Sequence, residues 1–491
     1  MDVTALLVRV IVLPVNLGRY VMMHTNGTSH PPGGRPATTR RSTSNLRLNR
    51  KTRRCAIWTF AAVLPAALIL AVCLAVLLPR HDRDHGGGNN NNDDGGTGGG
   101  NGNGNSDGGG FDTYPASAYP SPSSIRGTIP HNARPRTLDP SLVRRRSDGK
   151  LFLYTTGGRN CSIWTADAVR GPWTKIAGPG SDSDATGPGA GALAEQCGAP
   201  QVYGPLGSDG AYYLVHNSHM YDYAREDGVS DPEATRPWHD ASLAVQSSRT
   251  LEPGSWRRHG RLEIPWSRDY NVLDGALLSV PTTGNGNDDN NENILAFGSY
   301  QAGIYALPLA DPPTRLADGA MRRLAHLQRN ASAAVSSSPR GRTEAAFLYA
   351  RGRWTYLFFS AGRCCPHRGG RWPARRAGDV YRVMVCRRPS GAPWWGGGGG
   401  SNGDDEEDFV DKEGRSCRSD DGGTEILASH GGIWAPGGQG VLEDDGGWGE
   451  GGVLLYYHYV PFDQQAQRPG KGFRFGWNRL EFGDAGWPVV V

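Results

Sequence analysis

One phrase recurs five times between residues 139 and 460 of this chain. A short apolar strand opens on a small or acidic residue, a polar turn follows, and a strand dense in aromatic residues closes the phrase. The copies begin at Asp139, Ala199, Asp274, Glu344 and Pro436, at spacings of 60, 75, 70 and 92 residues. Each spacing is long enough for one four-stranded sheet, and sheets repeated in this way pack radially. The sequence therefore predicts an all-β, five-bladed β-propeller over residues 131–491.

The rest of this region fits the same class. Strand-like runs alternate with Gly, Asn and Asp turns, and no long segment has helical periodicity. Two inserts, 284–293 and 394–425, interrupt the pattern, and we interpret the second as a solvated loop. The C-terminal segment 475–490 is expected either to supply the outermost strands of the last blade or to close the ring against the first.

The region before the repeats has a different composition. Residues 1–84 carry 12 Lys and Arg against 3 Asp and Glu, whereas the remainder carries 40 against 45. Residues 55–79 contain no charge, and 25 uncharged, mainly apolar residues are enough to cross a bilayer as a helix. Basic residues cluster on the N-terminal side of this segment, which predicts a type II signal-anchor with a disordered cytoplasmic tail at 1–54. The repeats are then extracellular or in the secretory lumen.

A low-complexity segment separates the predicted span from the blades. Residues 86–110 consist of Gly, Asn, Asp, Ser and Thr, which cannot bury a core. We assign 80–130 to a flexible linker with a Pro/Ser-rich lead-in. Six of the eight cysteines follow the span, where disulfides persist, and six cysteines allow 15 pairings that the sequence does not distinguish. The acidic repeat region has no basic stripe for nucleic acid.

Three of the five copies open on a carboxylate: Asp139, Asp274 and Glu344. If equivalent positions of each blade face a common axis, these side chains meet there. Glycoside hydrolysis with inversion needs a general acid and a general base about 6.5–9.5 Å apart. A third carboxylate would raise the pKa of the acid by like-charge repulsion. The alternative is that each acidic residue only caps a local turn.

The phrases TLDPSLVR, NVLDGALL, FGSYQAGI, TEAAFLY, LFFSAGRCC, YRVMVCR, APGGQGVL, LLYYHYV and GWPVV follow one another in order over residues 131–491. This succession resembles glycoside hydrolase family 43, in its endo-1,5-α-L-arabinanase branch of five-bladed propellers. The resemblance implies that Asp139 is the general base, Glu344 the general acid and Asp274 the residue that tunes the pKa of the acid.

Further site residues are candidates for binding a sugar. The aromatic platforms would be Tyr300, Phe359 and Trp434, with Ser299 and Arg363 as hydrogen-bond donors; inter-blade packing is the alternative for the aromatic residues. The resemblance also implies a histidine near an axial Ca²⁺ or Na⁺ in a structural role. His430 is the candidate ligand, with Gln439 close by, and the chemistry itself needs no cofactor.

The chain departs from the family pattern at several positions beside the site. Leu138 replaces the usual histidine, residues 198–201 read GAPQ where the family has a WAPD-like phrase, Gly275 replaces a proline, Ala346 replaces the proline of EAP, and Gln301 replaces a tryptophan. None of these changes removes a reacting carboxylate. They are expected to alter subsite preference.

The function predicted from the sequence is hydrolysis of internal α-1,5-L-arabinofuranosidic bonds in arabinan by a membrane-tethered monomer. An exo-arabinofuranosidase, a β-xylosidase and a non-catalytic propeller that binds arabino-oligosaccharides remain the alternatives. The partners expected are therefore arabinan and, through residues 55–79, a lipid bilayer.

Overall fold

The computed structural model describes most of the repeat region and a short segment before it. The described residues are 111–125, 137–157, 160–178, 197–206, 209–219, 241–267, 269–281, 291–300, 302–329, 342–366, 372, 374–395, 408–419, 422–444 and 452–491. The predicted cytoplasmic tail, membrane span and Gly/Asn linker at 1–110 lie outside them. Within the described segments, no helix has the length and apolar character needed to cross a bilayer.

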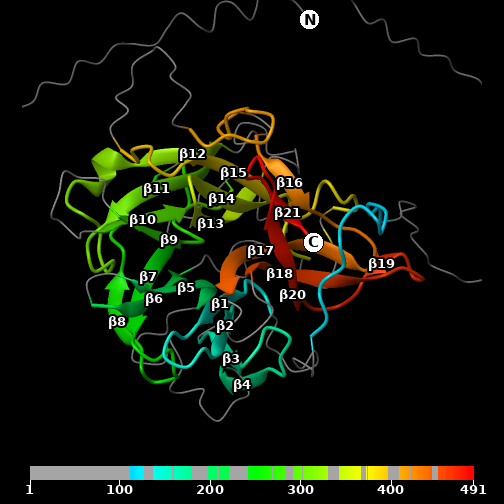
Figure 1. Cartoon of the computed structure of the whole chain (residues 1–491), viewed down its shortest axis with the longest axis horizontal. Coiled ribbons are helices and arrows are strands. Elements are labelled where there is room, and N and C mark those ends of the chain that lie inside the picture. Colours follow the sequence, from blue (N-terminus) through cyan, green and yellow to red (C-terminus); the bar gives the residue numbers. More distant parts are fainter. Residues whose placement is uncertain are drawn as a thin grey trace, which may run out of the picture. The chain divides into compact units, whose positions relative to one another are not determined.

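Five antiparallel sheets surround a common centre, each built from one continuous stretch of chain (Figure 1). Blade 1 comprises β1 (Ser141–Arg144), β2 (Leu151–Thr155), β3 (Ser162–Ala166) and β4 (Thr174–Ala177). Blade 2 comprises β5 (Gly198–Leu206), β6 (Ala211–His219), β7 (Ser242–Ser248) and β8 (Arg257–Arg261). Blade 3 comprises β9 (Ala276–Pro281), β10 (Asn291–Phe297), β11 (Gly303–Leu309) and β12 (Ala325–Arg329), with a 3₁₀ turn, η2 (Ala320–Arg323), before β12.

Blades 4 and 5 complete the ring. Blade 4 comprises β13 (Thr343–Arg351), β14 (Trp354–Ala361), β15 (Arg382–Pro389) and β16 (Thr424–Leu427). Blade 5 comprises β17 (Ile433–Asp444), β18 (Gly452–Asp463), β20 (Arg474–Phe482) and β21 (Pro488–Val490), and β19 (Arg468–Pro469) pairs with β18. The innermost strands contact one another in the order β1, β5, β9, β13, β17, and β17 contacts β1 again. The predicted five-bladed propeller is confirmed, and the C-terminal segment supplies the outer strands of blade 5.

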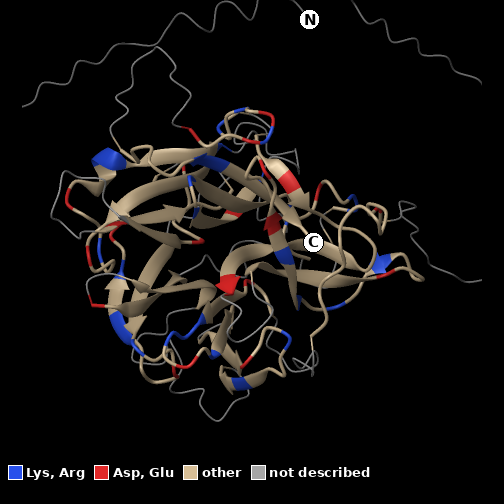
Figure 2. Cartoon of the chain, in the orientation of Figure 1, with Lys and Arg blue, Asp and Glu red and all other residues tan. Residues whose placement is uncertain are grey.

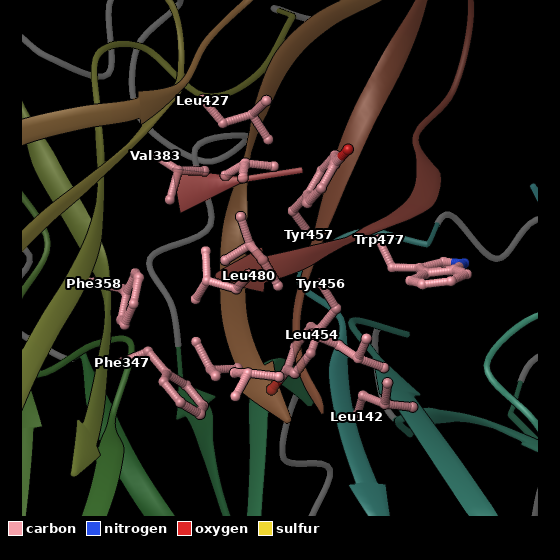
Figure 3. Close-up of a cluster of buried hydrophobic side chains, with 14 of the residues drawn as sticks. Leu142, Phe347, Phe358, Val383, Leu427, Leu454, Tyr456, Tyr457, Trp477 and Leu480 are labelled. Atoms are coloured by element: carbon pink, nitrogen blue, oxygen red, sulfur yellow. The ribbon is translucent and has the colours of Figure 1, made fainter. Parts of the chain in front are cut away.

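Apolar side chains fill the spaces between the blades. Because each sheet is stacked between two others, its strands are buried on both faces; all five residues of β2 are buried. One cluster joins blades 1, 4 and 5 and includes Leu142, Phe358, Tyr456 and Trp477 (Figure 3). Lys, Arg, Asp and Glu lie mainly on outer strands and loops (Figure 2). The core therefore lies between the blades, and the residues at the central ends of the inner strands are available to form a site.

Every blade has a left-handed residue at the start of its innermost strand. These residues are Asp139 (φ 51°), Ala199 (38°), Asp274 (56°), Ala345 (54°) and Ala435 (52°). Each lies two residues before the residue at which the innermost strand starts to pair with the second strand of the blade, or pairs again after a bulge. In blade 4 this position is Ala345 and not Glu344. The expectation that all three acidic residues occupy equivalent positions is therefore wrong for Glu344, whose side chain extends from one residue earlier.

Residues 111–125, which were expected to lead into the folded region, pack against blades 4 and 5. Tyr114 N–H donates to Ser429 O at 3.0 Å, and Ser123 N–H donates to Trp477 O at 2.8 Å. The ring of Phe111 contacts Trp434 edge-on, with centroids 5.3 Å apart. The packed structure thus begins before residue 131, and a short strap runs across the last two blades (Figure 1).

Three disulfides join the six cysteines of the repeat region: Cys161–Cys197, Cys364–Cys365 and Cys386–Cys417. The third shows that part of the second insert is not a solvated loop. Phe409 is buried, Val410 pairs with Arg387, and Cys417 is tied to β15. Residues 408–419 therefore pack onto blade 4.

Candidate active site

The left-handed residues surround the propeller axis, and a side chain binds the backbone N–H of each one. The bonds are Ala199 N to Thr156 Oγ1 (2.8 Å), Asp274 N to Asn217 Oδ1 (2.9 Å), Ala345 N to Asp274 Oδ2 (3.1 Å), Ala435 N to Ser429 Oγ (2.8 Å) and Asp139 N to His458 Nδ1 (3.0 Å). A buried amide without a partner is costly, so these side chains hold the inner turns in place. In four of the five cases the acceptor comes from the preceding blade, with blade 5 preceding blade 1.

Asp139 lies where blade 5 meets blade 1. Thr156 Oγ1 donates to its Oδ2 at 2.7 Å, and His458 Nδ1 lies 3.6 Å from its Oδ1. The Asp139 side chain keeps 23% of its surface exposed, whereas His458 is buried. Since His458 Nδ1 accepts the Asp139 amide proton, the neutral ring carries its own proton on Nε2. Asp139 is thus fixed through its backbone and one oxygen while its side chain remains reachable by water.

Asp274 has two structural partners. Asn217 Nδ2 donates to its Oδ1 at 3.0 Å, and the Ala345 amide donates to its Oδ2. Both carboxylate oxygens are therefore engaged, one by blade 2 and the other by blade 4. The second bond holds the residue directly after Glu344, so Asp274 helps to fix the backbone that carries Glu344.

Glu344 on β13 pairs with Ser360 on β14, and a bulge follows in β13 before Phe347 pairs with Phe358. Ser299 Oγ donates to Glu344 Oε2 at 2.6 Å, and the Tyr381 hydroxyl donates to Oε1. The Tyr381 ring stacks on His458, with centroids 5.8 Å apart. One short chain of contacts therefore links Glu344 to Asp139 through Tyr381 and His458.

The three carboxyl groups are close enough to perturb one another. Burial, followed by the charge of Asp274, raises the pKa of Asp139 to about 7, although Thr156 opposes the shift. Burial, then Asp274, and more weakly Asp139, raise the pKa of Glu344 to about 8 against the hydrogen bonds from Ser299 and Tyr381. Burial also raises the pKa of Asp274, against its bonds from Asn217 and Ala345. Glu344 thus keeps its proton to higher pH than Asp139, as a general acid paired with a general base must.

Two glycines let β17 approach the site. A Cβ on Gly438 would lie 2.6 Å from His458 Nδ1 and 3.3 Å from Asp139 Oδ1. A Cβ on Gly437 would collide with the Tyr381 ring. Gly438 N–H donates to Ser360 Oγ, which itself donates to Gln439 Oε1. The predicted residue Gln439 is buried, and its Nε2 donates to Ala345 O at 2.8 Å, so it braces the turn beneath the site.

Three of the predicted sugar-binding residues lie next to the carboxylates. Ser299 is buried and holds Glu344. Tyr300 is partly exposed, is left-handed (φ 57°), and donates its N–H to Thr343 O. Arg363 pairs through its backbone with Asp379 and Tyr381 and so positions the start of β15. Tyr300 keeps part of its surface exposed, and the Arg342 guanidinium lies over its ring, 5.5 Å from the centroid.

Three other predictions need correction. Phe359 is 1% exposed in the cluster between blades 3 and 4, and Trp434 is fully buried against Phe111, Trp372 and Phe462. Neither ring has a face open to a sugar. His430 is 1% exposed, and its Nδ1 and Nε2 face the carbonyl oxygens of Ala428 and Pro120 at 2.8 and 3.1 Å. It anchors the strap and is not placed as a metal ligand.

The histidine near the axis is instead His458. Burial lowers its pKa to about 3, so it stays neutral, and its Nε2 is a buried atom without a hydrogen-bond partner among the described residues. Because Nδ1 accepts the Asp139 amide proton, Nε2 carries the ring proton, and neither nitrogen offers a lone pair to a cation. Among the described residues, no group of three or more His, Cys, Asp or Glu side chains could hold a metal ion either. The described residues therefore do not fit the resident cation that the resemblance implies.

Sequence reasoning missed Thr156, Asn217, Tyr381 and His458. A signal for three of them exists. In each copy a polar residue stands late in the aromatic strand or just after it, in the order Thr156, Asn217, Ser299, Ser360 and His458. Each of the five bonds a carboxylate or a turn amide at the axis. A polar residue that breaks or follows the apolar run of this strand was therefore an indication of the site.

Sequence comparison finds curated relatives that span most of the chain. Arabinan endo-1,5-alpha-L-arabinosidase A of Aspergillus aculeatus is 33% identical over 379 residues, which cover 76% of this chain and 95% of that protein. Arabinan endo-1,5-alpha-L-arabinosidase C of Emericella nidulans is 35% identical over 360 residues, covering 72% and 91%. No protein-family model matches the chain.

Solved structures of similar fold are more distant. An exo-1,5-alpha-L-arabinanase from a bovine ruminal metagenomic library is 18% identical with a TM-score of 0.49 and covers 74% of this chain and all of that one. An alpha-L-arabinanase of Cellvibrio cellulosa is 20% identical with a TM-score of 0.48, covering 73% and 96%. At this distance the structures carry no argument about function.

Proposed function

This chain belongs to the arabinan endo-1,5-alpha-L-arabinosidases, which are glycoside hydrolases, and we propose that it cleaves internal α-1,5-L-arabinofuranosidic bonds of arabinan in one displacement with inversion. Asp139 takes a proton from water as the water attacks the anomeric carbon. Glu344 gives its proton to the departing oxygen on the opposite face. Asp274 keeps Glu344 protonated through its charge and holds the adjacent turn.

The observation that carries this proposal is the meeting of three carboxyl groups from blades 1, 3 and 4, where burial and the charge of Asp274 raise the pKa of both Asp139 and Glu344. A carboxyl group with a raised pKa can keep its proton near neutral pH, as a general acid must. Ser299 and Tyr381 orient Glu344, and Thr156 orients Asp139. Reacting groups held in this way need no reorganisation during the reaction.

The test is to incubate the purified protein with linear α-1,5-arabinan and to follow product size and anomeric configuration. We expect a ladder of oligosaccharides at early times, and the first sugars detected by proton NMR should be β-anomers. Products of retained configuration would contradict a single displacement. Arabinose as the sole early product would indicate exo action, and binding without new reducing ends would indicate a non-catalytic propeller.

We also propose that residues 55–79 anchor the enzyme as a type II membrane protein with its blades outside the cytoplasm. The uncharged stretch and its basic N-terminal flank support this topology. In sealed microsomes, added protease should leave the blades intact and remove only the N-terminal tail. Digestion of the blades in sealed vesicles would reverse the orientation, and recovery of the protein in the soluble fraction would exclude the anchor.

A further inference from the structure

The disulfide between the neighbouring residues Cys364 and Cys365 differs from the other two in exposure. Both of its cysteines are partly exposed, whereas all four cysteines of Cys161–Cys197 and Cys386–Cys417 are at most 1% exposed. It follows directly after β14, the strand that contributes Ser360 to the site. Gly362 (φ 100°) precedes it, and a Cβ there would collide with the carbonyl of Val380. The backbone before the disulfide is therefore packed tightly, while both cysteines keep part of their surface exposed.

The contribution of this disulfide to stability is expected to be small. A crosslink stabilises chiefly by restricting the unfolded chain, and the effect grows with the length of the loop that it closes. Cys161–Cys197 spans 36 residues and Cys386–Cys417 spans 31, but Cys364–Cys365 spans one. Stabilisation of the fold therefore explains Cys364–Cys365 less well than it explains the other two disulfides.

Its position points to the reacting groups. Arg363, the residue before it, accepts the Tyr381 amide proton at 3.1 Å, and the Tyr381 side chain donates to Glu344. Cys364, Cys365 and Leu138 all pack, partly buried, against the cluster that contains Tyr381. Leu138 directly precedes Asp139. The disulfide and Leu138 are thus among the partly exposed apolar groups of one cluster, together with Phe111 and Ala374, and this cluster contains Tyr381, which bonds Glu344.

We propose that Cys364, Cys365 and Leu138 form an apolar wall of the active site against which a furanose ring of the substrate packs. A furanose has a weakly apolar C–H face, and polarizable sulfur makes favourable contacts with such surfaces. The disulfide also fixes both sulfur atoms in one arrangement, so little side-chain entropy is lost when the sugar binds. The inference deepens the proposed function and rests on it, because it names residues that select the sugar.

The test compares hydrolysis of linear arabinan by the wild type and by the double variant C364A/C365A. Losing about 50 Å² of apolar contact should raise KM about tenfold. The value of kcat should stay within about twofold, because no reacting group changes. Val489→Ala removes a more exposed apolar side chain from β21, far along the chain from the site, and serves as the control. A purely structural disulfide would lower the melting temperature without raising KM, and that result would overturn the proposal.

A binding experiment separates this inference from the proposed function. Calorimetry with linear α-1,5-arabinohexaose is carried out on E344Q and on E344Q/C364A/C365A, neither of which needs to turn over. A dissociation constant about tenfold weaker in the second protein supports the wall, and equal constants refute it. Absence of hydrolysis by the wild type would refute the proposed function whatever these constants are.

Should the double variant not fold, the same measurements apply to Leu138→Ala and to the wild type reduced after folding. Tris(2-carboxyethyl)phosphine is oxidised to its oxide as a disulfide becomes two thiols, and the exposed pair should react before the buried ones. Titration should then count two thiols more than before reduction, since Cys55 and Cys73 lie outside the three disulfides, and KM should rise as in the variant. An unchanged KM with two additional thiols and with Leu138→Ala would refute the wall.

Discussion

The five blades use the same left-handed backbone position for different purposes. Blades 1 and 3 place an aspartate there, blades 2 and 5 place an alanine, and blade 4 places Ala345 there with Glu344 just before it. A non-glycine residue in this conformation costs roughly 1–2 kcal/mol. Ala199 and Ala435 bear this cost without any reacting group. The turn is therefore a requirement of the propeller, and the chemistry has been added to three copies of it.

The same comparison explains how the carboxylates are held. In every blade a side chain binds the amide of the left-handed residue, whether or not that residue is acidic. At Asp139 and Asp274 these bonds also fix a carboxylate relative to its neighbours. The catalytic arrangement is thus built from contacts that the fold already makes, and removing a carboxyl charge should leave the turn intact.

The sharpest test of this separation is to replace the acidic side chains by their amides. Asp139→Asn and Glu344→Gln should each lower kcat on linear arabinan by about 10³-fold, because proton transfer is lost. The melting temperature should change little, since the side-chain bonds to the turn amides remain. Both quantities are measured on the same preparations.

The matched control is Asp148→Asn in the β1–β2 turn of blade 1, where the carboxylate pairs with Arg145 at the surface. It should keep full activity. If Asp139→Asn or Glu344→Gln kept the wild-type kcat, the carboxyl group replaced would have no role in the reaction, and its blade would not differ in function from blades 2 and 5.

Removing the acceptor that holds a turn should affect both stability and activity. His458→Phe keeps a ring against Tyr381 and Phe473 but leaves the Asp139 amide without its partner. We expect a loss of about 1–3 kcal/mol of unfolding free energy. Because Asp139 is displaced, kcat should fall about tenfold or more. Urea unfolding and steady-state kinetics measure the two effects.

His326→Phe in blade 3 is the control, because His326 stacks on Tyr305 and bonds Ala302 O away from the carboxylates. It should lose stability and keep its kcat. Equal kcat for both variants would mean that the amide bond at Asp139 contributes only to folding.

A smaller effect is expected where a side chain touches the carboxylate itself. Thr156 donates to Asp139 and so lowers its pKa, against the rise to about 7 caused by burial and Asp274. In Thr156→Val this opposition is gone, so the pKa of Asp139 rises further, and the Ala199 amide also loses its acceptor, which lowers stability. A base must be ionised, so the acidic limb of the profile of kcat/KM against pH should move to higher pH, while the alkaline limb set by Glu344 near 8 stays in place. The profile becomes narrower, and kcat/KM at pH 6 falls about threefold.

Ser247→Ala in blade 2, whose hydroxyl contacts His259, provides the comparison because it lies away from the three carboxylates. Its pH profile should match the wild type. A shift of the alkaline limb in Thr156→Val would instead couple Thr156 to Glu344.

The sequence was sufficient to predict the five blades and the three carboxylates, because strand-opening residues recur at a readable spacing. It did not identify the axial histidine. His430 and His458 both flank β17, and the bulges at 434–437 and 437–440 shift the register by amounts that no pattern shows. Phe359 and Trp434 were misplaced for a different reason. Blades are buried on both faces, so alternation along a strand does not tell an aromatic residue of the core from one at the site.

The smallest expected effect compares the two alanine blades. Glycine adopts a positive φ without steric cost, so Ala199→Gly should gain about 0.5–1 kcal/mol of unfolding free energy, with part of the relief offset by backbone entropy. Ala435 has the same conformation but is fully buried among Trp434 and Phe462, so Ala435→Gly also loses a buried methyl worth about 0.8 kcal/mol. Thermal unfolding should therefore show a higher melting temperature for Ala199→Gly and little change for Ala435→Gly. If neither variant is more stable than the wild type, the left-handed turns are not strained. The hydrogen bonds to their amides would then be the remaining sign that the fold imposes these turns.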